Sequence, residues 1–232
     1  LRGSEIPGQT SNISQPILMD MSDAGDRIAF ASGSDIAMYY WEDTIESKRW
    51  APMLGNKARI TLEEPVTTMD LSGDGSRLAV SFCDEDTGTV LSDTVMVFEE
   101  DTEPEFPGNW VNIGGELNNV QAGELFGCTS VSLSRRGRQM AVGAPARDGL
   151  PGVDTGYTFV YQFGTFGMAF DEIPSWKLLG GPISGELAED ASGTTVVLSG
   201  SGSIVAIAAP LNDNENGENA GSIRVYEFRS AE

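Results

Sequence analysis

The 232-residue sequence contains no histidine and only two cysteines. Without histidine the chain cannot form a Ser-His-Asp or Cys-His catalytic group, and it lacks the commonest side-chain ligand of transition metals. No Gly-x-x-x-x-Gly-Lys phosphate-binding loop occurs either. Cys83 and Cys128 do not make a disulfide framework, and we predict that both are small packed residues rather than nucleophiles. These absences predict a protein that is not an enzyme.

Basic residues are also scarce, since 14 Lys and Arg stand against 35 Asp and Glu, which gives a formal net charge of -21. Phosphate backbones bind to clusters of lysine and arginine, so we expect no nucleic-acid partner. No apolar run reaches the length of a membrane-spanning helix, so we expect no membrane insertion. Acidic pairs such as Glu63–Glu64 and the 99–101 run are expected in solvated loops. Any association of such acidic chains should depend on salt.

What the sequence does contain is a repeat. Four segments share one frame, which reads apolar, any, apolar, Ser, two turn residues, Gly, two further residues, apolar, Ala, apolar. The segments are 19–30, 69–80, 131–142 and 196–207. Their serines, Ser22, Ser72, Ser134 and Ser199, recur at intervals of 50, 62 and 65 residues. A period of this size is typical of one four-stranded propeller blade.

Each copy predicts a hairpin followed by further antiparallel strands. The first two strands should reverse at a glycine, because a tight turn needs residues that tolerate positive φ. These glycines are Gly25, Gly75, Gly137 and Gly202. A third strand follows with apolar residues at alternate positions, and a fourth strand opens with a tryptophan that supplies apolar area between neighbouring sheets. These tryptophans are Trp50, Trp110 and Trp176.

The predicted fold class is therefore all-β, with four repeated antiparallel sheets of three to four strands in a propeller-like arrangement whose closure stays open. The repeat units fall at about 17–49, 50–109, 110–175 and 176–232 within a single domain that covers residues 1–232. Helical spacing of apolar residues is absent, so helix content should be very low. The fourth copy has no tryptophan strand, which predicts an exposed sheet edge there.

The repeat resembles the FG-GAP repeat of integrin α-type β-propellers. The third copy carries the likeness best, with Phe126-Gly127, the Ala141 to Pro145 stretch, and Gly156 before the 159–161 strand. The version with Ser-Leu-Ser, Trp and Leu-Gly is similar to repeat proteins of diatoms and other algae, some of which form sheets around the carbon-fixing compartment of the plastid. The resemblance implies a propeller. With the non-Met start at Leu1, it leaves a processed chain in the plastid, at the pyrenoid periphery, or outside the cell.

The resemblance also implies calcium as a candidate ligand, because hairpin loops of this family bind it through Asp-x-Asp-x-Asp-Gly. Here the spacing is mostly broken. Asp70 and Asp74 before Gly75 come closest, Asn212, Asn214 and Asn216 before Gly217 form a second candidate, and Asp84 with Asp86 before Gly88 a third. A solvated turn is the alternative for each.

We therefore expect a non-enzymatic structural or scaffold protein that assembles with copies of itself through sheet edges and loops, for example into a shell or lattice. No cofactor other than calcium is expected. The alternative function is an extracellular, calcium-dependent adhesion or ligand-binding propeller module.

Overall fold

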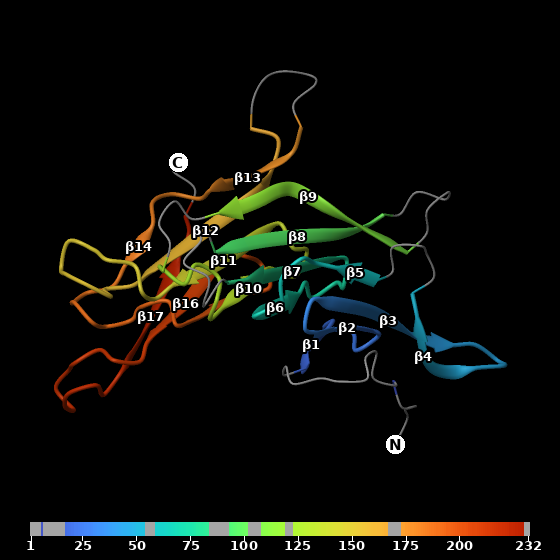
Figure 1. The fold of residues 1–232 in the computed structure, drawn as a ribbon, viewed down its shortest axis with the longest axis horizontal. Helices are drawn as coiled ribbons and strands as arrows, with labels where there is room; N and C mark the ends of the chain where they lie inside the picture. The colour runs from blue at the N-terminus through green and yellow to red at the C-terminus, as the bar shows by residue number, and fades with distance from the viewer. Residues whose placement is uncertain are drawn as a thin grey trace.

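The computed structural model describes residues 6, 17–53, 59–83, 93–101, 108–118, 123–166 and 173–229. Within these residues the chain forms seventeen strands and no helix, and the strands make four separate antiparallel sheets that follow one another along the chain (Figure 1). The predicted all-β fold of four antiparallel, propeller-like sheets is confirmed. No helix of the described part is long and apolar enough to cross a membrane.

The first two sheets hold nine of the strands. The first sheet comprises β1 (Ile17–Met21), β2 (Arg27–Ser32), β3 (Asp35–Asp43), β4 (Lys48–Pro52) and β5 (Arg59–Thr61). The second comprises β6 (Thr68–Leu71), β7 (Arg77–Phe82), β8 (Thr94–Asp101) and β9 (Asn109–Asn118). In the first sheet β4 and β5 pair with opposite ends of β3, so that together they occupy the fourth position.

The last two sheets differ in their outer strands. The third comprises β10 (Val131–Leu133), β11 (Gln139–Ala144), β12 (Tyr157–Gly164), β13 (Ser175–Leu178) and β14 (Ile183–Ser184). The fourth comprises β15 (Thr195–Leu198), β16 (Ile204–Ala209) and β17 (Ser222–Glu227). Because the fourth position is split in the first and third sheets, these have five strands where three to four were expected, and the fourth sheet has three, β15-β16-β17.

The repeated serine and glycine close the first hairpin of every sheet. The four glycine amides donate to the serine carbonyls three residues earlier at 2.7–2.9 Å, and all four glycines have positive φ between 59° and 73°. The serine hydroxyl then accepts from the backbone amide five residues later, at 2.9–3.1 Å in all four copies. One side chain thus fixes the turn and the start of the second strand, which explains its place in the frame.

Successive sheets pack face to face through three apolar cores. The first strands lie in series, with β1 against β6, β6 against β10, and β10 against β15. The core between the first two sheets contains Leu71 and Trp110, the next contains Leu133 and Trp176, and the last is smaller and contains Leu198. Trp176 also donates from its indole to the Ile113 carbonyl at 3.2 Å. The tryptophans of β9 and β13 therefore pack against the preceding sheet.

Each tryptophan strand pairs with the strand that comes just before it in the chain, and so forms the outer part of that strand's sheet. Trp50 pairs with Trp41 of β3, Trp110 with Glu100 of β8, and Trp176 with Phe163 of β12. The expected unit boundaries before residues 50, 110 and 176 thus fall inside β4, β9 and β13, which complete the sheets of the units before them. No earlier sheet covers Trp50, which is partly buried beside a small cluster of Phe30, Ala37 and Tyr39 together with Ile6.

Candidate functional site at the ends of the sheet array

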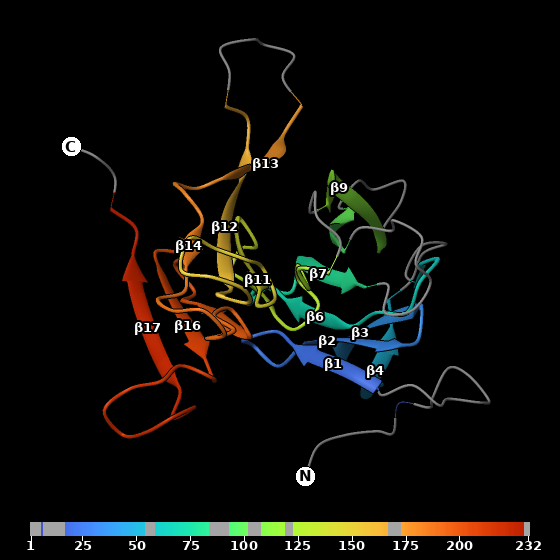
Figure 2. The ribbon, with the colours of Figure 1, turned by 60° about the vertical axis from the view of Figure 1, so that its left-hand side comes forward.

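In the described part of the chain, the fourth sheet has no counterpart of the strand that completes each of the other three at its outer edge. In the first and third sheets the carbonyls of Met38 and Val160 accept from Met53 and Leu179, at 3.0 and 2.6 Å. Val225 occupies the same repeat position in β17, and within the described residues no strand pairs with the outer side of β17. Figure 2 shows β17 at the outer margin of the molecule. A sheet edge of this kind is a template for pairing with another chain.

Each sheet has two faces that can be defined by the repeat. We call the side that carries the apolar residues before the serine the leading face, and the side that carries the alanine of the second strand the trailing face. Leading faces of the second to fourth sheets pack on trailing faces of the first to third. Among the residues that the structure describes, the leading face of the first sheet and the trailing face of the fourth have no such neighbour.

Side chains at the same repeat position differ in exposed fraction according to whether a neighbouring sheet packs on their face. On the trailing face, Val225 is 65% exposed whereas Met38, Val97 and Val160 at the same position are 1–2% exposed. On the leading face, Met21 is 49% exposed whereas Leu71, Leu133 and Leu198 are 4–6% exposed. The remaining large exposed apolar residues of the two end faces are Ile17 and Met19 at one end and Val197, Ile204 and Ile223 at the other. Sequence reasoning found the free edge but not these faces, although the aligned positions carried the signal.

The first calcium candidate does not gather its ligands in this arrangement. Asp70 points toward the third sheet, where its Oδ2 accepts from the Leu133 amide at 2.6 Å. Burial, together with the nearby charge of Asp20, raises the pKa of Asp70 to about 7, and the Leu133 hydrogen bond opposes this shift.

Asp74 instead serves its own turn, where it accepts from the hydroxyls of Ser72 and Ser76 at 2.9 and 2.7 Å and from the Ser76 amide at 3.0 Å. Burial acts to raise the pKa of Asp74, but these hydrogen bonds and the charge of Arg77 outweigh it, so the pKa is lowered. The two carboxylates therefore serve different sheets.

The asparagine candidate is also held by hydrogen bonds within its loop. Asn212 is buried and donates from Nδ2 to Asp190 Oδ2 at 3.0 Å. The Oδ1 of Asn214 accepts both the amide and the side-chain Nδ2 of Asn216, at 2.9 and 3.1 Å. An oxygen that faces two N–H donors is not presented to a cation. The third candidate, Asp84 with Asp86, lies outside the described residues.

The cysteine prediction is wrong. Cys83, which follows β7 of the second sheet, forms a disulfide with Cys128, which precedes β10 of the third. The buried Asp93 lies beside the two sulfurs, and its Oδ2 accepts from the Phe126 amide at 2.9 Å. Among the described residues this is the one group of three Cys, Asp or Glu side chains whose ligand atoms converge. The disulfide occupies its sulfurs and fixes the second sheet to the third.

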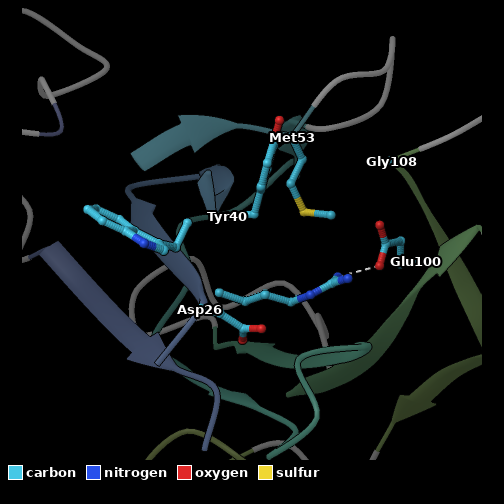
Figure 3. A pocket seen from close by; sticks show the side chains of 7 residues that line it. Asp26, Tyr40, Met53, Glu100 and Gly108 are labelled. Atoms are coloured by element: carbon cyan, nitrogen blue, oxygen red, sulfur yellow. Dashed lines mark hydrogen bonds and ion pairs between the residues drawn. The ribbon is translucent and has the colours of Figure 1, made fainter. Parts of the chain in front are cut away.

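The expectation that the 99–101 acidic run lies in a loop is also wrong. These residues end β8, where Glu99 forms an ion pair with Arg77 at 2.8 Å and Glu100 with Arg27. Glu100, Arg27, Tyr40 and Met53 line a cavity of about 350 Å³ between the first two sheets, shown in Figure 3. Arg27, which lines the cavity, forms an ion pair with Glu100. Asp26 also lines the cavity, and its Oδ1 accepts from the Ser22 hydroxyl at 2.8 Å, so the cavity offers one ion pair and one hydrogen-bonded carboxylate.

Comparisons with known proteins assign no family. No protein-family model matches the chain, and no curated protein matches it. Among solved structures, hydrazine synthase of Kuenenia stuttgartiensis aligns with a TM-score of 0.49 and 13% identity over 90% of this chain and 58% of that chain. The Cps50 (Swd1) β-propeller domain of Myceliophteria thermophila aligns with a TM-score of 0.49 and 10% identity over 91% of this chain and 53% of that one. The chain thus spans a little over half the length of these two proteins, and no functional argument follows from likenesses this weak.

Proposed function

We propose that this chain is a non-enzymatic scaffold module that associates with copies of itself through the ends of its sheet array. The observation that carries the proposal is the incomplete fourth sheet. Its third strand, β17, has no described strand on its outer side, whereas the equivalent strands β3, β8 and β12 each pair with a further strand. Main-chain groups at such an edge, beside exposed apolar side chains, favour association with another protein surface. The proposed likeness to FG-GAP and algal repeat proteins agrees with this function.

Light scattering coupled to size-exclusion chromatography tests the proposal directly. The monomer has a mass of 24.7 kDa, and we expect the mass to rise above this value with protein concentration. Because the net charge is -21, association should strengthen as salt is raised and screens the repulsion between copies. A protein that stays monomeric at every concentration and salt level contradicts the proposal.

A chain extended at its C-terminus by a copy of its own residues 173–184 tests the edge itself. This segment contains β13 and β14, which complete the third sheet, so the added copy should pair with β17 and reduce association. An extension of the same composition in scrambled order is the matched control, and it should leave association unchanged. Equal association of the two extended chains would show that the β17 edge is not used.

Calcium-dependent adhesion remains the alternative function, and it has less support from the contacts. Calcium would have to replace the N–H and O–H donors that now bind Asp74 and Asn214. Thermal unfolding with calcium and with a chelator decides between the two functions. A calcium-induced rise in melting temperature, in a protein that stays monomeric, would favour adhesion over self-association.

A further inference from the structure

The three internal junctions between sheets share a polar device as well as an apolar core. In the frame, one residue lies between the two apolar positions that precede the serine. In the first three copies its side-chain oxygen accepts a hydrogen bond from a backbone amide in the first strand of the next sheet. These residues are Asp20, Asp70 and Ser132. These amides belong to Leu71, Leu133 and Leu198, and the distances are 2.6, 2.6 and 3.1 Å. Each of these trailing faces thus carries a side-chain oxygen, at the same repeat position, that accepts from the backbone of its neighbour.

A second polar position repeats at the start of the second strand. Arg27 donates to the carbonyl of Gly75 at 3.5 Å, and Arg77 donates to the carbonyl of Gly137 at 3.0 Å. In the third sheet the side chain of Gln139 packs against Gly202. Each of these residues reaches from its own trailing face to the turn glycine of the following sheet.

The fourth sheet replaces both polar residues with apolar ones. Val197 stands at the position of Asp20, Asp70 and Ser132, and Ile204 at the position of Arg27, Arg77 and Gln139. Both are exposed, beside Ile223 and Val225 on the same face. A terminal repeat that ends in water normally has a polar outer face, because that face is never covered. Here the uncovered face is more apolar than its covered counterparts, which is the pattern of a surface built to be covered.

The first sheet supplies a matching surface. Met19 and Met21 on β1 occupy the leading positions that in later copies fill the junction cores, and the exposed Ile17 lies beside them on the same face. Ile6 packs near Phe30 and Tyr39, farther out on the same face, and leaves the margin along β1 exposed. In the internal junction between the third and fourth sheets, the leading strand β15 lies against β10 and β11. The equivalent contact at the ends would place β1 of one copy against β15 and β16 of another.

We propose that two copies of the chain join head to tail, with the trailing face of the fourth sheet of one copy packed on the leading face of the first sheet of the next. This inference rests on the proposed function and names the surfaces that it uses. A second copy is the occupant because the joint continues the geometry of the three internal junctions. The contact joins two different surfaces, so it is heterologous. After a single joint forms, each copy has one free face left, and the pair as a whole has one free leading face and one free trailing face.

Two substitutions block one face each. Met19→Glu places a charge on the leading face, and Val225→Glu places one on the trailing face, where each side chain is exposed and the monomer should fold normally. Each variant alone should be monomeric at concentrations where the wild type associates. Ile45→Glu, at a fully exposed turn residue that lies on neither end face, is the matched control for added charge and should associate like the wild type.

Mixing the two blocked variants gives the decisive result. Met19→Glu retains a normal trailing face and Val225→Glu a normal leading face, so an equimolar mixture should form a one-to-one dimer of about twice 24.7 kDa and nothing larger. Failure of the mixture to associate, when each variant alone is monomeric, would overturn a head-to-tail joint in favour of like-with-like contacts. Association of either single variant at wild-type strength would overturn the joint and leave self-association standing. A wild type that never associates would overturn both.

Discussion

The junction between the second and third sheets and the two ends of the array are made from the same repeat positions with opposite outcomes. At the junction, Val97 and Leu133 are buried in one apolar core. At the ends, Val225 and Met21 hold the same positions and face solvent. The repeat therefore specifies a face that is suited to burial, and the presence of a neighbouring sheet decides whether it is buried.

The largest expected effect comes from substituting alanine at one leading-face position in two different sheets. Leu71→Ala should lower the free energy of unfolding by about 2–4 kcal/mol, because it leaves a cavity in the core between the first two sheets. Met21→Ala, at the same repeat position in the first sheet, should change it by less than about 0.5 kcal/mol in the monomer. Denaturant unfolding of dilute protein measures both. Equal losses would mean that the leading face of the first sheet is covered within the chain.

The disulfide makes the second junction different from the other two. Cys83 and Cys128 are separated by 45 residues, so removing their bond frees a long loop in the unfolded chain. By the chain-entropy model, the double substitution Cys83→Ser with Cys128→Ser should cost about 2–4 kcal/mol. Melting temperatures with and without a thiol reductant provide the check. The wild type should lose stability in reductant and the double variant should not respond, whereas a wild type that is indifferent to reductant contradicts the expected contribution.

Alanine substitution of two turn glycines compares the stability cost at an end of the array with the cost at a junction between sheets. Gly25 and Gly137 both have positive φ, so alanine at either position should cost about 1 kcal/mol. A Cβ at Gly137 would also lie 2.7 Å from Arg77 Cβ, whereas at Gly25 the nearest atom is Met21 Sδ at 3.7 Å. Gly137→Ala should therefore cost about 1–3 kcal/mol more than Gly25→Ala. Thermal unfolding of both variants measures the difference, and equal losses would show that the Arg77 side chain moves freely.

The sequence predicted the parts of this fold that are encoded locally. The Ser and Gly of each frame determine a hairpin within a few residues, and the alternation around Val97 or Val225 determines a strand, so both could be recognised without knowing their neighbours. The missing outer strand could be recognised in the same way, because a tryptophan segment is absent from the fourth copy. These features depend on spacing within one copy.

Features that depend on contact between copies were not predictable from spacing alone. The bond between Cys83 and Cys128 requires that the end of β7 meet the loop before β10, and the pairing of Glu100 with Arg27 joins two different sheets. The exposed faces belong to this class too. Val225 has the same pattern as Val160, and only the position of its sheet at the end of the array leaves it uncovered. An alignment of the copies by sheet order would have brought the two cysteines onto adjacent sheets.

The last comparison is between two acceptors that bind the next sheet in the same way. Burial raises the pKa of Asp70 to about 7, so the folded protein keeps this proton at pH values where the unfolded chain, with an ordinary value of 3.8, has released it. Between these values the folded state binds more protons, so the free energy of unfolding falls as pH rises, by at most ~1.4 kcal/mol per pH unit from this group. Ser132, which accepts from Leu198 at the next junction, has no such dependence because it does not ionise.

Asp70→Asn keeps an oxygen acceptor for the Leu133 amide and removes the ionisation. The melting temperature of this variant relative to the wild type should therefore rise as pH increases from about 4 to about 7, by up to about 10 °C in all. Ser132→Ala is the matched control at the third junction, and its difference from the wild type should stay constant over the same range. Because the other carboxylates are common to all three proteins, their repulsion cancels in the comparison. A constant difference for Asp70→Asn as well would mean that Asp70 ionises in the folded protein as it does in the unfolded chain, and that the two junctions use equivalent acceptors.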